Sequence, residues 1–102
     1  MTIINISTFL NAMSSERNFS ANTIASYAHD LKKFEQFQVK LNNKILESTR
    51  EQIEGFLKEE FDQGLTLATR ARRLSSIKQF FKFVLDENKR TDNPAIKIKL
   101  TS

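Results

Sequence analysis

Apolar side chains recur at spacings of three and four residues along most of this chain, and that spacing constrains its fold more than any other feature. Such spacing places apolar residues on one side of an α-helix. The 102 residues include only two Gly and one Pro, which argues against a turn-rich β-fold and against a flexible repeat. The length suits one small domain. We therefore predict an all-α fold, a compact four-helix bundle.

Four segments carry the helical pattern, at about residues 4–17, 20–39, 48–64 and 66–88. The expected apolar face of the first segment is made by Ile3, Ile6, Phe9, Leu10 and Met13. The second has Ile24, Tyr27, Leu31, Phe34 and Gln38, and the third has Ile53, Phe56, Leu57, Glu60 and Phe61. The fourth has Leu74, Ile77, Phe81, Val84 and Leu85. The nine Phe residues are explained by bulky rings that fill a small core.

Several expected helix ends coincide with residues that favour them. Ser20 is a suitable N-cap, because its hydroxyl can accept a free first-turn amide. The third helix opens at Ser48 or Thr49, and Ser48 with Glu51 makes a candidate capping box. Gly64 is a natural C-terminal stop.

The last dozen residues read differently from the helices. Asn93 can cap a short helix that begins at Pro94. The tail IKIKLTS alternates weakly, and the sequence suggests no partner for it within the chain. We therefore divide the chain into a helical domain, residues 1–90, and a short C-terminal helix or linker, residues 91–102.

Composition excludes several classes of protein. The chain has no Cys, which removes disulfide scaffolds and thiolate metal sites, and its single His29 cannot make a zinc cluster alone. No apolar run approaches the roughly 18 residues that span a bilayer. The N-terminus lacks the basic region of a signal peptide. We expect a cytoplasmic protein without a metal or cofactor.

The positive charge is concentrated in one segment. The net charge is +4, but residues 66–90 carry seven basic and two acidic side chains, whereas residues 44–65 carry three and six. This segregation favours one basic side that suits a phosphate backbone. A solvated helix face is the alternative explanation, and charge alone does not separate the two.

Polar stripes lie opposite the apolar stripes of the second and fourth segments. They consist of Asn22, Ser26, His29 and Lys33, and of Arg72, Ser75, Gln79 and Lys82. Such slender polar faces can enter the major groove of DNA. Thr23 and Thr69 lie near the helix starts, where backbone amides can hold a phosphate.

Two sequence blocks resemble a known family. SANTIASYAHDLKKFEQF is similar to the second helix of tyrosine recombinases of the phage-integrase and Xer type, and RARRLSSIKQFFKFV resembles their fourth helix. The Asp-Asn-Pro-Ala run at 92–95 resembles the stretch that leads into the catalytic domain of that family. The first helix, with Phe9-Leu10 before Glu16-Arg17-Asn18-Phe19-Ser20, fits the family as well, so the resemblance extends in order over nearly the whole chain.

The resemblance implies a core-binding, SAM-like domain that packs on one side of the DNA at a recombination half-site. A larger C-terminal catalytic domain would close the clamp from the other side. The family's catalytic Tyr, Arg pair, Lys and His belong to that second domain. Tyr27 matches a helix position of the family and not its catalytic Tyr, and His29 does not begin the family's catalytic His-x-x-Arg motif. We therefore expect no cleavage by this chain alone, a monomer in isolation, and contacts with other protomers in the full-length recombinase on DNA.

The candidate DNA-binding residues combine the polar stripes with the basic segment. They are Asn22, Thr23, Ser26, Lys33, Thr69, Arg70, Arg72, Arg73, Ser75, Ser76, Gln79 and Lys82, with His29 and Lys78 as further candidates. Arg70 and Arg73 lie closer to the apolar side than Arg72, so they are expected to extend around the rim of the core. The main alternative is a helical protein-interaction module with a basic face. A small enzyme is disfavoured, because there is no Gly-rich phosphate loop, metal cluster or nucleophile triad.

Overall fold

All four predicted segments form α-helices in a computed structural model that describes residues 4–100. The helices are α1 (Ile6–Ser15), α2 (Ala21–Lys40), α3 (Arg50–Asp62) and α4 (Leu67–Asp86), with a short 3-10 helix, η1 (Ile45–Glu47), before α3. The described residues contain no strand, so the all-α prediction is confirmed. Ile3, expected on the first apolar face, and the end of the expected linker, 101–102, lie outside the described residues.

Side-chain caps fix where all four α-helices begin, with Asn5 as the N-cap of α1. The Ser20 hydroxyl accepts the backbone amide of Thr23, as predicted, and Thr66 caps α4 in the same way. Of the two predicted starts of the third helix, Thr49 is the N-cap of α3; it forms the capping box with Gln52, so the candidate box of Ser48 with Glu51 is wrong. Ser48 is buried and its hydroxyl donates to the carbonyl of Ile45, 2.6 Å away.

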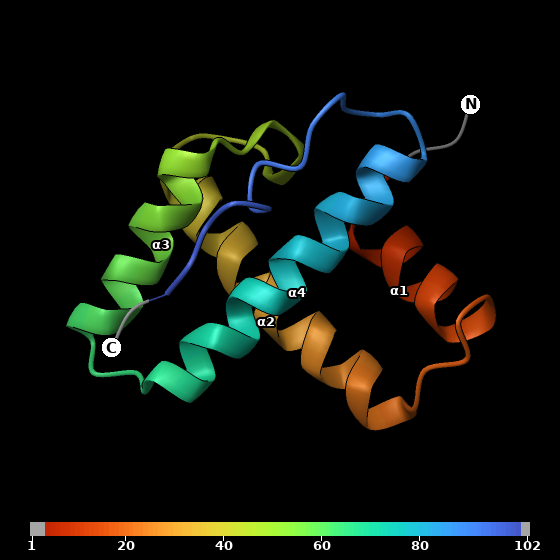
Figure 1. The fold of residues 1–102 in the computed structure, drawn as a ribbon, viewed down its shortest axis with the longest axis horizontal. Helices are drawn as coiled ribbons and strands as arrows, with labels where there is room; N and C mark the ends of the chain where they lie inside the picture. The colour runs from red at the N-terminus through yellow and green to blue at the C-terminus, as the bar shows by residue number, and fades with distance from the viewer. Residues whose placement is uncertain (1–3, 101–102) are drawn as a thin grey trace.

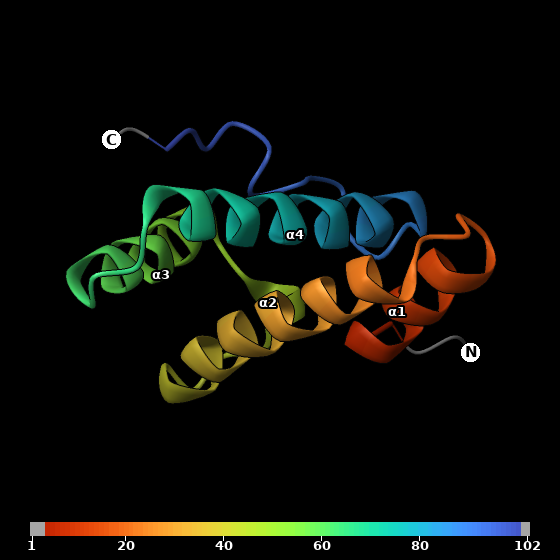
Figure 2. The ribbon, with the colours of Figure 1, turned by 90° about the horizontal axis from the view of Figure 1, so that it is seen from below.

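Helices α2 and α4 cross at the centre of the molecule, with α1 against one side and α3 against the other (Figure 1). From the crossing, the N-terminal halves of both helices diverge toward the lower edge of Figure 1. The C-terminal segment runs along the face of α4 that points away from α2 (Figure 2). Helix α4 is therefore held between α2 and the end of the chain.

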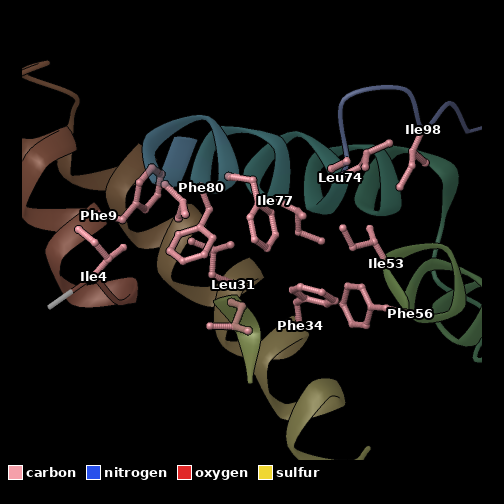
Figure 3. Close-up of a cluster of buried hydrophobic side chains, with 14 of the residues drawn as sticks. Ile4, Phe9, Leu31, Phe34, Ile53, Phe56, Leu74, Ile77, Phe80 and Ile98 are labelled. Atoms are coloured by element: carbon pink, nitrogen blue, oxygen red, sulfur yellow. The ribbon is translucent and has the colours of Figure 1, made fainter. Parts of the chain in front are cut away.

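Five buried Phe rings, at 9, 34, 56, 80 and 81, pack among aliphatic side chains in the core (Figure 3). The fully buried Phe9 packs against Tyr27, Phe80 and Phe83, with ring centroids 5.5 to 5.7 Å apart. The edge-to-face packing of Phe9 on Phe80 and Phe83 adds stability beyond the area that it buries.

One Phe departs from the prediction: Phe61, expected on the buried face of its helix, is 56% exposed.

The C-terminal segment corrects two expectations. Residues 94–97 form turns and not a short helix, although the Asn93 side chain does accept the amide of Ala95. The expectation that the tail lacks a partner is wrong for Ala95 and Ile98, which are buried, and for Leu100, which packs against the core. Ile98 joins the same cluster as Leu74 of α4 (Figure 3).

Candidate nucleic-acid interface

The crossing of α2 and α4 is built around one buried carboxylate, Asp30, which is not exposed to solvent at all. Arg72 donates to it twice, from Nη2 at 2.8 Å and from Nε at 3.2 Å. Arg73 donates from Nη1 at 2.8 Å, and the Ser76 hydroxyl donates at 2.6 Å. A buried carboxylate needs such partners, because removing its charge from water is costly.

A second carboxylate completes this cluster from α3. Arg73 also donates from Nε to Glu60 at 2.8 Å, so its guanidinium joins α2 and α3 through α4. Two guanidiniums therefore balance two carboxylates, and the cluster is neutral as a whole. We call Asp30, Glu60, Arg72, Arg73 and Ser76 the ionic cluster.

The structure corrects the surface position expected for three of the candidate DNA-binding residues. Arg70, Arg73 and Ser76 are only 6%, 5% and 2% exposed. Arg73 and Ser76 face the ionic cluster. Arg70 lies over the ring of Phe61, 5.0 Å from its centroid, and donates to the carbonyl of Leu65. Arg70 and Arg73, which the sequence analysis places at the rim of the core, are therefore buried inside it.

Beside the ionic cluster, a groove of about 240 Å³ opens between the N-terminal halves of α2 and α4. Its lining includes the candidate residues Asn22, Thr23, Ser26, Arg72, Ser75 and Ser76, together with Tyr27. The Arg72 side chain remains 49% exposed although it contacts the buried Asp30. The fold thus brings an arginine, hydroxyl groups and an amide to one concave surface.

The remaining candidates lie away from this groove. Gln79 and Lys82 line a separate hollow against the end of α1, and the Lys82 ammonium is 3.0 Å from Asp86. Lys33 lies on α2 beyond the crossing; it is exposed and has no ion-pair partner within residues 4–100. Thr69 lies one turn before Arg72, and its hydroxyl accepts that of Thr66. His29 is exposed and Lys78 is half-buried.

Carboxylates compensate much of the positive charge of residues 66–90. Arg72, Arg73, Lys82 and Arg90 each have a carboxylate oxygen within about 3 Å. The segment therefore presents less free charge than its sequence count suggests.

The sequence reasoning missed Asp30 and Glu60 as partners of these arginines. Asp30 falls between Tyr27 and Leu31 on the apolar side of α2, and Glu60 was counted on an apolar face without a partner. An acid on one apolar face and Arg73 on another are the sequence signal of a buried ion pair, because such groups are almost never buried unpaired.

One carboxyl group after α4 has a perturbed pKa. Hydrogen bonds from the Arg90 side chain lower the pKa of Asp92, and the positive charge of Arg90 acts in the same direction. Arg90 also donates to the carbonyls of Leu46 and Ser48, at 2.9 and 2.8 Å. Arg90 thereby ties the end of α4 to η1.

Other kinds of site find little support in the described part of the chain. Among residues 4–100, no three His, Cys, Asp or Glu side chains are grouped so that they could hold a metal ion. Within the same range, no helix has the length and apolar character needed to cross a membrane.

Residues 6–88 match the family described as the N-terminal SAM-like domain of phage integrase. The chain is 36% identical over 89 residues to the tyrosine recombinase XerD of Agrobacterium fabrum, and 40% identical over 90 residues to XerD of Chlorobaculum tepidum. It is 34% identical over 90 residues to XerC of Listeria monocytogenes. No solved structure gives a significant match.

The chain belongs to this family of N-terminal SAM-like domains of phage integrases and tyrosine recombinases. Its relatives named above are Xer recombinases, and the alignments cover 84% to 88% of this chain. They cover 27% to 30% of the relatives, so the chain spans less than a third of their length.

Proposed function

We propose that this domain binds double-stranded DNA along the edge where the N-terminal halves of α2 and α4 diverge. The observation that carries the proposal is the groove between these helices, which contains a half-exposed arginine among hydroxyl and amide side chains. Guanidinium, hydroxyl and amide groups are the donors that proteins most often present to phosphates. Membership of the integrase family supports the same ligand.

The groove residues divide by chemistry into two roles. Arg72, Thr23 and Ser75 are proposed to donate to phosphate oxygens, because a cation and hydroxyl groups suit an anion of any sequence context. Asn22 and Ser26 on the first turns of α2 are the proposed contacts to base edges, since an amide can pair with adenine and a hydroxyl with several bases. Lys33, on the same helix, is proposed as an outlying phosphate contact.

The relatives bear the name tyrosine recombinase, and we propose that this chain serves such an enzyme as its DNA-gripping N-terminal part. The strand-cutting chemistry would then reside in the larger portion of the relatives that this chain does not match. Contacts with further recombinase protomers on DNA belong to the same proposal.

Salt dependence of binding tests the proposal directly. The chain would be titrated into a labelled, mixed-sequence DNA duplex at several salt concentrations. Because many basic side chains already contact carboxylates, we expect about three phosphates to be neutralised and a log–log slope of about −3. Counting the basic side chains in the sequence, without their carboxylate partners, predicts about five neutralised phosphates and a steeper slope.

Two results would contradict DNA binding. One is no binding at low salt, and the other is binding whose affinity does not change with salt. If the chain forms a stoichiometric complex with another protein and does not bind DNA, the alternative of a helical protein-interaction module is favoured.

A further inference from the structure

We propose that Asp30, which no solvent reaches, is a positioning residue that holds the Arg72 guanidinium in the orientation that meets a DNA phosphate. This inference rests on the proposed DNA binding and names the device that organises the groove. Asp30 lies below the groove floor and cannot itself touch DNA. It acts through the two hydrogen bonds that it accepts from Arg72.

The geometry leaves one side of the Arg72 guanidinium free for a ligand. Nε and Nη2 both donate to Asp30, so the planar group is held at two points. Nη1 has no acceptor within residues 4–100, and the side chain is 49% exposed where it lines the groove. A guanidinium has five donors in a fixed plane, so fixing two of them also fixes the direction of the rest.

Arg72 differs from Arg73 in what the fold needs from it. Arg73 is 6% exposed in its side chain and is shared by Asp30 and Glu60, so it holds the core together. Ser76 supplies a further donor to Asp30. Arg72 is the member of the ionic cluster that reaches solvent, and it is therefore the one that can bind an external anion.

Because the ionic cluster is neutral, its contribution to DNA binding can be assigned either to net charge or to directed hydrogen bonds. Two carboxylates offset two guanidiniums, so the cluster contributes little to long-range attraction. Its contribution to DNA binding must come from directed, short-range hydrogen bonds of Arg72. A side chain held in advance loses less conformational entropy on binding than a free arginine.

Asp30→Asn gives opposite predictions under the two explanations. If only net charge matters, removing an acid makes the domain more positive and DNA binding tighter. If Asp30 positions Arg72, the loss of the two-point grip weakens binding by about tenfold, despite the added positive charge. Glu35→Gln is the matched control, because Glu35 lies on the same helix, changes the charge equally and has no ion pair within residues 4–100.

Arg72→Lys provides an independent test if Asp30→Asn prevents folding. Lysine keeps the charge at this position but lacks the planar group with two donors that face one carboxylate. We expect Arg72→Lys to bind DNA about as weakly as Arg72→Ala, while its thermal unfolding midpoint stays near that of the wild-type domain. Wild-type affinity in Arg72→Lys would overturn the inference, because a point charge would then suffice.

The failure of this inference is distinguishable from the failure of the proposed function. If wild-type protein does not bind the duplex, the proposed DNA binding is wrong. If wild-type protein binds, but Asp30→Asn binds as tightly as Glu35→Gln, DNA binding stands and the positioning role of Asp30 is wrong.

Discussion

Helix α2 buries two polar side chains completely, Asp30 near its middle and Gln38 near its end, and their surroundings differ. The Gln38 amide donates to Ser48 at 2.7 Å and to Gln52 at 3.0 Å, so its cluster is neutral and tied to the start of α3. The cluster around Asp30 is ionic and extends through Arg72 to the surface. The Gln38 cluster therefore serves the packing of helices, whereas the ionic cluster joins the packing to a ligand-facing side chain.

The largest expected effect comes from breaking the ionic cluster at its shared guanidinium. Arg73→Met leaves Asp30 and Glu60 without the cation that lies between them. We expect the free energy of unfolding to fall by about 3–5 kcal/mol, which is typical when one partner of a buried ion pair is removed. Chemical denaturation measures it, with Lys89→Met on the exposed end of the same segment as the control. A loss no larger than that of the control would contradict the structural role.

The neutral cluster should be less costly to break. Gln38→Ala removes the donor to Ser48 and Gln52, but both acceptors keep other partners, the Ile45 carbonyl for Ser48 and the Thr49 amide for Gln52. We expect a loss of about 1–3 kcal/mol of stability and no change in DNA affinity. Denaturation and duplex titration on the same sample check both parts. Weakened DNA binding by folded Gln38→Ala would remove the distinction between the two clusters.

The surface member of the ionic cluster should affect both DNA binding and stability, but stability less than Arg73 does. Arg72→Ala removes two hydrogen bonds from the buried Asp30, which keeps those from Arg73 and Ser76, so we expect a loss of about 1–2 kcal/mol of folding free energy. DNA affinity should fall by about tenfold. Titrations against a panel of duplexes decide its role: an equal loss on all sequences indicates a phosphate contact, and a loss confined to one base pair indicates base readout.

The smallest expected effect concerns acid sensitivity outside both clusters. Because Arg90 lowers the pKa of Asp92 in the folded state, the ionised carboxyl stabilises the fold above its unfolded pKa. That contribution is lost as the pH falls through the folded pKa. Asp92→Asn should therefore be slightly less stable than wild type near neutrality, and the difference should vanish in strong acid. Thermal melts across the acidic range measure it, and a difference that persists in strong acid would contradict the assignment.

Local features made the fold predictable from the sequence. The spacing of apolar residues and the hydroxyl at Ser20 act within a few neighbouring residues, so the helix pattern and the cap of α2 were predicted correctly. The capping box of α3 was assigned to Ser48, where Thr49 makes it, because Ser48 is engaged by Gln38, a contact between residues ten positions apart. Such a contact leaves no signal in the local pattern that defines a cap.

The candidate interface was harder to predict than the fold. A helical projection showed that Arg72 and Ser75 lie opposite the apolar stripe, and both line the groove. It did not show that Asp30 lies beneath Arg72, because that pairing depends on where α2 and α4 cross. The Lys82–Asp86 pair has the i, i+4 spacing of a single helix, so it was readable from the sequence and was overlooked in the charge count. Counting charges along the sequence therefore overstated the free positive charge on α4.

The buried C-terminal segment has a practical consequence for where this domain ends. The family match stops at residue 88, yet Ala95 is not exposed at all and Ile98 is only 3% exposed. Both belong to the segment that runs along the side of α4 facing away from α2 (Figure 2). A recombinant protein cut at the end of the match would leave apolar atoms around Leu74 open to water, and exposed apolar surface of this kind promotes self-association. We therefore expect a recombinant protein that extends through residue 100 to stay monomeric better than one cut at the boundary that sequence similarity alone would set, a dozen residues earlier.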